Sequence, residues 1–180
     1  MKFTPLKLPD VMLIEPDLHS DNRGYFYETY NEKIFRENVT NFFTYFVQDN
    51  NSYSNAGTIR GLHYQDEPYE QGKIIRVISG KIFDVAVDIR KNSKTYGQYV
   101  CEILSNSNKK QLWIPPGYAH GFMALDDSAE IAYKVTNFYS EAHERTINYK
   151  DPLINIRWPE INQDYILSQK DLNAPFLERI

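Results

Sequence analysis

Apolar and polar residues alternate along two stretches of this chain, and a period of two is typical of a β-strand. In residues 83–89, FDVAVDI, one face carries Phe83, Val85, Val87 and Ile89, and the other carries Asp84, Ala86 and Asp88. Residues 130–139, EIAYKVTNFY, alternate in the same way and place Ile131, Tyr133, Val135, Asn137 and Tyr139 on a common face. We therefore predict a strand over each stretch.

Turn signals separate these and other short apolar runs. Ser79-Gly80 predicts a hairpin turn between the runs on either side of it. The polar segments 105–110 and 126–128 predict further turns, and NEKIFREN, residues 31–38, predicts a short helix with Asn31 as its N-cap. Many strands and little helix favour an all-β jelly-roll barrel of antiparallel strands, formed by one domain over residues 1–180. Such a barrel binds its ligand in the mouth.

The segment GTIRGLHYQ, residues 57–65, combines a strand-like pattern with charged chemistry. In a regular strand Arg60 and His63 would point to opposite faces, because side chains alternate. Gly61 lies between them, and a glycine inside a strand often marks a bulge. We predict a bulge at Gly61 that turns Arg60 and His63 toward one pocket.

Composition excludes several classes of protein. The net charge of −4 argues against nonspecific binding of nucleic acid, and one cysteine, Cys101, cannot form an intrachain disulfide. MKFTPLKLPD lacks the apolar run of a signal peptide, and no later stretch is apolar enough to span a membrane. We expect a soluble cytoplasmic protein. Its 14 Tyr, 10 Phe and 2 Trp suit a pocket for a flat or sugar-like ligand.

The four histidines, at positions 19, 63, 120 and 143, raise the question of a metal. His120 lies in IPPGYAHGF, which is typical of the second metal-binding strand of many jelly rolls, but the first-strand His-x-His pair is missing, since Tyr64 and Gln65 follow His63. A zinc or iron site needs about three suitable ligands. Nucleotide-binding and nucleophile-elbow motifs are absent from the sequence. We expect neither metal nor cofactor, and side chains alone to perform any chemistry.

Several segments, taken in order, carry a resemblance: DNRGYFYETY, FVQDNNSYS, RGLHYQ, QGKIIRVISGKIFDVAVDIRKNSKTYGQY, LWIPPGYAHGF, YKVTNFYS, DPLINIRWP and LSQKD. Together they closely resemble the dTDP-4-dehydrorhamnose 3,5-epimerase family of bacterial deoxysugar synthesis, from about residue 8 to residue 175. The resemblance implies a cupin-type jelly roll that works as a homodimer without a cofactor. It implies inversion of C3 and C5 of dTDP-4-keto-6-deoxyglucose, on the path to L-rhamnose and cell-surface polysaccharide such as lipopolysaccharide.

The resemblance also implies roles for individual residues. Inversion next to a ketone needs a base on one face, an acid on the other and a stabiliser of the enolate charge. His63 matches the base and Asp171 its hydrogen-bonded partner. Tyr133 matches the acid, and Lys73 matches a residue beside the reacting ketone. The substrate-binding positions implied by the resemblance are Arg23, Phe26, Glu28, Gln48, Asp49, Asn50, Arg60, Lys73, His120, Tyr139, Glu144 and Lys170.

Three other functions remain open on the sequence. A relative that inverts only one carbon, or acts on another nucleotide-linked 4-keto sugar, would share the same base and acid. A metal-dependent jelly-roll oxygenase or isomerase would need the His-x-His pair that is missing. A sugar-binding module without activity would not need a base, an acid and a charge stabiliser together.

Overall fold

Two antiparallel sheets face each other in the computed structural model, which describes residues 1–39, 45–162 and 164–178. The larger sheet has the order β1 (Lys2–Pro5), β2 (Met12–Glu15), β10 (Gln111–Ile114), β7 (Lys73–Ser79), β12 (Ser128–Val135) and β5 (Gln48–Asn55). The second has the order β13 (Glu144–Thr146), β6 (Ile59–Gln65), β11 (Tyr118–Ala124), β8 (Lys81–Asp88) and β9 (Tyr99–Ser105). This arrangement is the cupin-type jelly roll of antiparallel strands, and the predicted fold class is confirmed.

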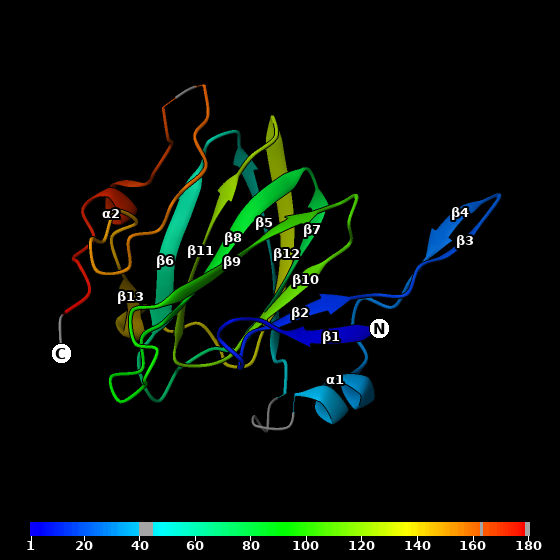
Figure 1. Cartoon of the computed structure of the whole chain (residues 1–180), viewed down its shortest axis with the longest axis horizontal. Helices are drawn as coiled ribbons and strands as arrows, with labels where there is room; N and C mark the ends of the chain where they lie inside the picture. Colours follow the sequence, from blue (N-terminus) through cyan, green and yellow to red (C-terminus); the bar gives the residue numbers. More distant parts are fainter. Residues whose placement is uncertain (40–44, 163, 179–180) are drawn as a thin grey trace.

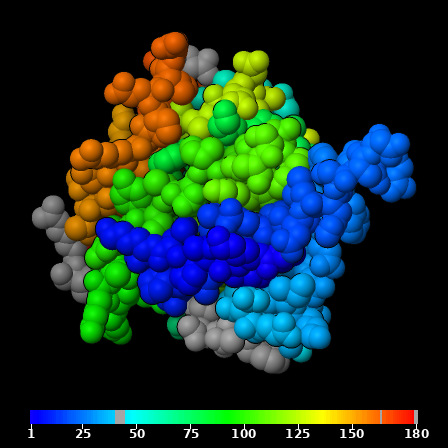
Figure 2. All heavy atoms as spheres, turned by 45° about the vertical axis from the view of Figure 1, so that its right-hand side comes forward, coloured from blue at the N-terminus to red at the C-terminus, as the bar shows by residue number. Residues whose placement is uncertain are grey.

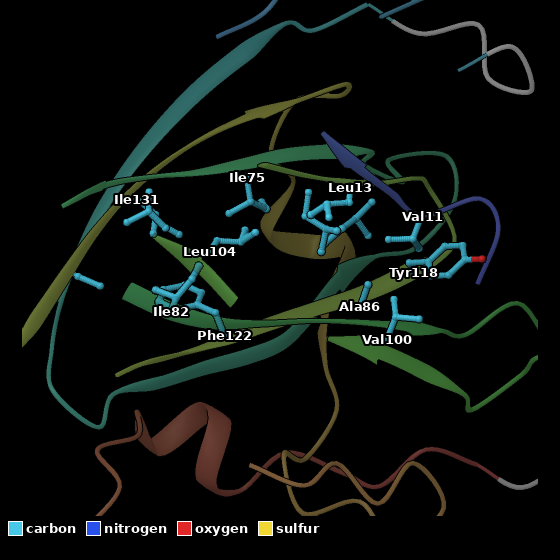
Figure 3. Packing of buried hydrophobic residues seen from close by; sticks show 14 of the residues in the cluster. Val11, Leu13, Ile75, Ile82, Ala86, Val100, Leu104, Tyr118, Phe122 and Ile131 are labelled. Carbon is cyan, nitrogen blue, oxygen red and sulfur yellow. The ribbon is translucent and has the colours of Figure 1, made fainter. Parts of the chain in front are cut away.

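The main core fills the space between the two sheets (Figure 3). Ile75 and Ile131 come from one sheet, Ile82 and Phe122 come from the other, and all four are almost fully buried. Apolar side chains on alternate positions of each strand supply this face, as the period of two predicts. Burying them removes apolar surface from water and holds the sheets together.

The outer faces of both sheets are covered in part by the rest of the chain. Helix α1 (Glu32–Asn38) places Phe35 against Trp113 of β10, with ring centroids 5.0 Å apart. The segment that follows β13 packs Ile147 and Ile154 against Val85 and Val87 of β8. Strand β8 is therefore buried on both faces, although its sequence alternates apolar and acidic residues.

A small hairpin of β3 (His19–Asp21) and β4 (Gly24–Phe26) projects from the body of the molecule (Figures 1 and 2). It pairs with neither large sheet, and its described residues are all exposed. Tyr25 and Phe26 show 56% and 68% of their surface to solvent. Such exposure of large aromatic rings marks a surface suited to a partner.

The predicted helix is present in the structure, whereas a predicted hairpin and a predicted strand end are not. Helix α1 is confirmed, with the Asn31 side chain accepting a hydrogen bond from the backbone N–H of Ile34 at 3.2 Å. The predicted turn at Ser79-Gly80 exists, but the prediction of a hairpin is wrong, because β7 and β8 belong to opposite sheets. A turn signal fixes the reversal of the chain but not which strands then pair. Strand β12 ends at Val135, so the prediction that the strand continues through Asn137 and Tyr139 is wrong.

The predicted bulge at Gly61 is confirmed. On β11, His120 and Phe122 are two residues apart, whereas their partners on β6, His63 and Arg60, are three apart. One extra residue on β6 therefore brings Arg60 and His63 to the same face. Gly61 has φ of +121°, and a Cβ there would lie 2.6 Å from the Cα of Gly121. Only glycine fits this backbone and this close approach.

Candidate active site

An open cavity of about 300 Å³ lies between the two sheets and gathers polar side chains from both. The larger sheet contributes from β5, β7 and β12, and the second sheet contributes from β6 and β13. The lining residues are Gln48, Asn50, His63, Tyr64, Gln65, Gln71, Lys73, Tyr133, Tyr139 and Glu144. The pocket thus unites seven of the residues singled out from the sequence.

His63 contacts a buried carboxylate from the far end of the chain. Its Nε2 lies 2.6 Å from Oδ1 of Asp171, which is 3% exposed. Asp171 belongs to the one-turn helix α2 (Gln169–Leu172), where its backbone N–H donates to the Ser168 hydroxyl at 3.1 Å. Because a carboxylate only accepts, Nε2 carries the shared hydrogen and Nδ1 of a neutral His63 is left as the proton acceptor.

The groups around Asp171 lower the pKa of its carboxyl. Burial raises the pKa of this carboxyl, whereas the hydrogen bond and the charge of His63 lower it. The Ser168 hydroxyl and the backbone of Gly61 also lower the pKa, which ends below its ordinary value. Asp171 is therefore ionised at neutral pH and can stabilise the imidazolium that His63 becomes when it accepts a proton.

Lys73, at the start of β7, is a buried cation of the cavity. It is 7% exposed, and its ammonium lies 3.5 Å from the backbone oxygen of His63. Burial lowers the pKa of Lys73 to about 8, while the negative charges of Asp84 and Glu144 oppose the fall. A desolvated ammonium in this position can stabilise negative charge on a bound ligand far better than one in water.

Tyr133 faces the cavity from β12, in the sheet opposite to the one that carries His63. Burial raises the pKa of the Tyr133 hydroxyl above its ordinary value; the charge of Arg60 opposes this shift and that of Glu144 adds to it. The phenol is therefore protonated at neutral pH and able to donate. A donor and an acceptor thus lie on opposite walls of one cavity.

The remaining polar groups of the cavity form a network near its rim. Gln48 donates to the side chain of Asn50 at 2.8 Å, which confirms that the two share a face of β5. Glu144 accepts from the Tyr139 hydroxyl at 3.0 Å and from Lys170 of α2 at 2.5 Å. Lys170 and Asp171 are adjacent, so one turn of helix is tied to both Glu144 and His63.

Arg60 lies on the same face of β6 as His63 but is not among the residues that line the cavity. Its guanidinium donates to the Ser54 hydroxyl and to the backbone oxygen of Tyr53, both at 2.9 Å. The side chain stays partly exposed, which leaves donor capacity for a ligand.

Several predicted substrate residues lie outside the cavity. Asp49 points to the other face of β5, where it pairs with Lys134 at 2.9 Å, because neighbouring strand residues alternate. Asp49 therefore does not line the cavity that Gln48 and Asn50 line. His120 is buried behind the lining residues and donates to Asp84 at 2.7 Å.

The N-terminal group of predicted residues also lies apart from this cavity. Arg23 and Phe26 are on the projecting hairpin, where Arg23 pairs with Asp21. Glu28 follows the hairpin and accepts from the Asn31 side chain at 3.2 Å. None of the three lines the pocket of its own chain among the described residues.

Two supporting residues were missed by the sequence reading. Ser168 stands three residues before Asp171, the spacing of an N-cap with an acidic residue in the first turn, and that signal was available. Asp84 was assigned only to the polar face of a strand. Its pairing with His120, 36 positions away, depends on which strands become neighbours and left no signal in the sequence.

Within the described ranges no three His, Cys, Asp or Glu side chains gather closely enough to hold a metal ion. The same part of the chain contains no helix that is both long and apolar enough to cross a membrane.

Comparisons with known proteins agree on one family. The family model described as dTDP-4-dehydrorhamnose 3,5-epimerase matches residues 5–179. The dTDP-4-dehydrorhamnose 3,5-epimerase of Shigella flexneri is 52% identical over 174 residues, which cover 97% of this chain and 94% of that protein.

Solved structures show the same similarity in three dimensions. The epimerase RmlC from Legionella pneumophila, in complex with dTDP-4-keto-L-rhamnose, is 44% identical with a TM-score of 0.93 and covers 98% of this chain and 92% of its own. ChmJ, a 3'-monoepimerase from Streptomyces bikiniensis in complex with dTDP-quinovose, is 31% identical with a TM-score of 0.88, covering 96% and 86%.

The jelly roll and its similarities define the class of this protein as an isomerase that epimerises carbohydrates. The chain belongs to the dTDP-4-dehydrorhamnose 3,5-epimerase family. The family predicted from the sequence is confirmed.

Proposed function

We propose that this chain inverts C3 and C5 of dTDP-4-keto-6-deoxyglucose, with His63 as the base and Tyr133 as the acid, and with no cofactor. The observation that carries the proposal is the placement of His63, backed by Asp171, and Tyr133 on opposite walls of one cavity. Inversion requires a proton to leave one face of the sugar ring and return to the other.

In the proposed reaction Nδ1 of His63 takes the proton from the carbon beside the C4 ketone. The electron pair of the broken C–H bond moves onto the ketone oxygen, and the resulting enolate is stabilised by the Lys73 ammonium. Tyr133 then donates its proton to the opposite face of the carbon and is reprotonated from solvent, and the His63 imidazolium releases its proton to solvent. The cycle runs once at C5 and once at C3.

The nucleotide would occupy the rim of the cavity. Arg60 is suited to a phosphate oxygen because its guanidinium donates at several fixed angles. Gln48 and Asn50 offer polar contacts to the nucleoside, and Tyr139 offers an exposed ring, with 54% of its surface free, for stacking on thymine. Glu144 and Lys170 would position the sugar, and His120 would support the cavity from behind.

The active form would be a homodimer in which the projecting hairpin reaches the cavity of the partner subunit. This arrangement would give Arg23, Phe26 and Glu28 the substrate contacts that the family resemblance implies, although they lie outside the cavity of their own chain. It would also cover the exposed rings of the hairpin. Sedimentation at micromolar concentration, with a variant lacking residues 19–26 as comparison, tests this: a monomeric wild-type protein would contradict it.

We place this activity in the cytoplasm, as one step of the dTDP-L-rhamnose pathway toward cell-surface polysaccharide. The exposed free thiol of Cys101 is compatible with a reducing compartment.

Incubation with dTDP-4-keto-6-deoxyglucose in D₂O tests the proposed function. Deuterium at both C3 and C5, read by mass spectrometry and NMR, is the expected result. Absence of exchange would refute catalysis on this substrate. Elemental analysis of the purified protein, run in parallel, tests the metal-dependent alternative.

A second candidate function is inversion at one carbon only. It is favoured by the similarity to ChmJ, which is a 3'-monoepimerase with the same fold. Deuterium at C3 or C5 alone would support this function in place of the first.

Replacement of Tyr133 by Phe should impair reprotonation more than the first exchange. The variant keeps the ring that packs against the core but loses the proton that the hydroxyl donates. We expect inversion to slow by about 10²–10³-fold while washout of the C5 hydrogen, which requires only the base, falls much less. Equal losses in both measurements would remove the acid role of Tyr133.

A further inference from the structure

Asp84 is a buried carboxylate that the proposed reaction does not yet use. It lies on β8 and is 0% exposed. Its Oδ1 accepts a hydrogen bond from Nε2 of His120 at 2.7 Å, so its side chain is held in place from β11. No described side chain or backbone group donates to its Oδ2. Half of this carboxylate is therefore buried without a hydrogen bond.

Asp88, four residues further along the same strand, shows how the fold satisfies a structural carboxylate. Asp88 is also 0% exposed, but it accepts hydrogen bonds from Arg90, Ser93 and Thr95, and both of its oxygens are occupied. Burying an ionised oxygen without such donors is costly unless a positive charge lies nearby. A positive charge near Asp84, without a hydrogen bond to Oδ2, would offset the cost of burying this oxygen.

The interior of the barrel offers a specific candidate for that cation. Asp84 is the register partner of Phe122, and Phe122 lies on the same face of β11 as His120, so Asp84 points to the interior with them. Lys73 enters the same interior from β7 and is 7% exposed, and its ammonium lies 3.5 Å from the backbone oxygen of His63. The negative charge of Asp84 acts on the Lys73 ammonium. Lys73 can therefore balance the charge of Asp84, and Asp84 is one of two negative charges that act on Lys73.

We propose that Asp84 is a positioning residue for the epimerisation: it is the buried counter-ion that keeps Lys73 protonated in the cavity, while His120 holds its carboxylate in place. The inference rests on the proposed function for its catalytic consequence. Without this charge, burial would favour a neutral amine, and a neutral amine stabilises an enolate poorly.

Other ionisable groups lie near Lys73, and their charges also affect the pKa of its ammonium. Lys73 shares the cavity lining with His63 on β6, Tyr133 on β12 and Glu144 on β13. The charge of Asp84 on β8 acts on Lys73, and Asp84 is hydrogen-bonded to His120 on β11. Glu102 on β9 is the register partner of Asp84. Of these, Asp84 and Glu144 supply the negative charges that act on Lys73.

Asp84→Asn isolates the charge, because an asparagine oxygen can still accept from His120. In the wild-type and variant proteins without substrate, NMR of the lysine ε-methylene groups reports the titration of Lys73. We expect the midpoint of Lys73 to fall by about two to three pH units in the variant. At pH 7 we expect kcat to fall about 10–100-fold with KM changed less than about threefold. The alkaline limb of kcat/KM should move to lower pH by the same amount as the NMR midpoint.

Asp88→Asn is the matched control, since it removes an equally buried charge from the same strand. It should lower stability while leaving the Lys73 midpoint unchanged and kcat within about threefold of wild type. An Asp84→Asn protein that is folded, with an unchanged Lys73 midpoint, overturns the inference even if the enzyme is active on another substrate. If the proposed function is wrong but the inference on Asp84 is right, the wild-type protein shows no deuterium exchange into the substrate, while the Lys73 midpoint still falls in Asp84→Asn.

Should Asp84→Asn fail to fold, the double variant Lys73→Met/Asp84→Asn, which removes both charges, replaces it. If Asp84 acts through Lys73, the double variant turns over no more slowly than Lys73→Met alone, because coupled residues are not additive. A further loss of tenfold or more overturns the inference.

Discussion

His63→Asn should lower kcat by about 10²–10⁴-fold while substrate still binds. An asparagine amide can donate to Asp171, as the imidazole does at 2.6 Å, so the wall of the cavity keeps its shape. The amide has no basic nitrogen, however, and no proton can leave the sugar by this route. The measurement is steady-state inversion at pH 7, with ligand affinity determined by calorimetry.

His143→Asn is the control for this change. His143 lies outside the cavity lining, hydrogen-bonds the Ser140 hydroxyl at 2.8 Å and packs on the Tyr69 ring. Its replacement should leave kcat within about threefold of wild type. Retention of a tenth or more of the activity in a folded His63→Asn protein would show that another group is the base.

Lys73→Met should reduce kcat by about 10²–10³-fold, the size expected when one charged stabiliser of an oxyanion is lost. Methionine fills a similar volume without the ammonium, so the enolate oxygen faces an apolar group. In the wild-type protein kcat/KM should decline above about pH 8, where Lys73 loses its proton. The variant should lack this alkaline limb.

The same change should stabilise the fold. The pKa of Lys73 is about 8 in the folded state against an ordinary value of 10.5, so the buried ammonium disfavours folding wherever both states are protonated. The free energy of unfolding should therefore rise by up to about 3 kcal/mol in Lys73→Met below pH 8.

The gain should shrink between pH 8 and 10.5, the window in which the unfolded wild-type chain holds a proton that the folded chain has released. Denaturant unfolding at pH 7 and pH 10 measures both effects. Lys81→Met, at a surface ion pair with Asp126, is the control and should change neither activity nor stability by much. A Lys73→Met protein less stable than wild type at pH 7 would contradict the assigned cost of burial.

Local patterns predicted much of this molecule because they depend on near neighbours. The alternation over 83–89 identified β8, and Asn31 identified the start of α1. The position of Gly61 between Arg60 and His63 identified the bulge, since only a glycine tolerates that backbone. In each case the responsible interaction spans only a few residues.

Strand pairing and side-chain orientation across the sheets were harder to predict from the sequence. The turn at Ser79-Gly80 was predicted, but its strands separate into two sheets, because the pairing of β7 and β8 depends on competing partners elsewhere in the chain. The resemblance implied substrate contacts for Asp49 as well as for Gln48 and Asn50, but Asp49 points to the opposite face of β5. The family resemblance implied contacts for all three residues but carried no information on which face of the sheet each side chain would occupy.

The amino-acid sequence by itself determined the all-β class, the helix cap, the bulge and, through its ordered motifs, the family to which this chain belongs. Only the tertiary structure decided that the charge of Asp84 acts on Lys73 from the opposite sheet, that β7 and β8 join different sheets, and that the hairpin residues lie outside the cavity lining. The reason is physical: side-chain propensity acts over a few residues, whereas these contacts arise from the packing of two sheets, which the whole chain chooses together.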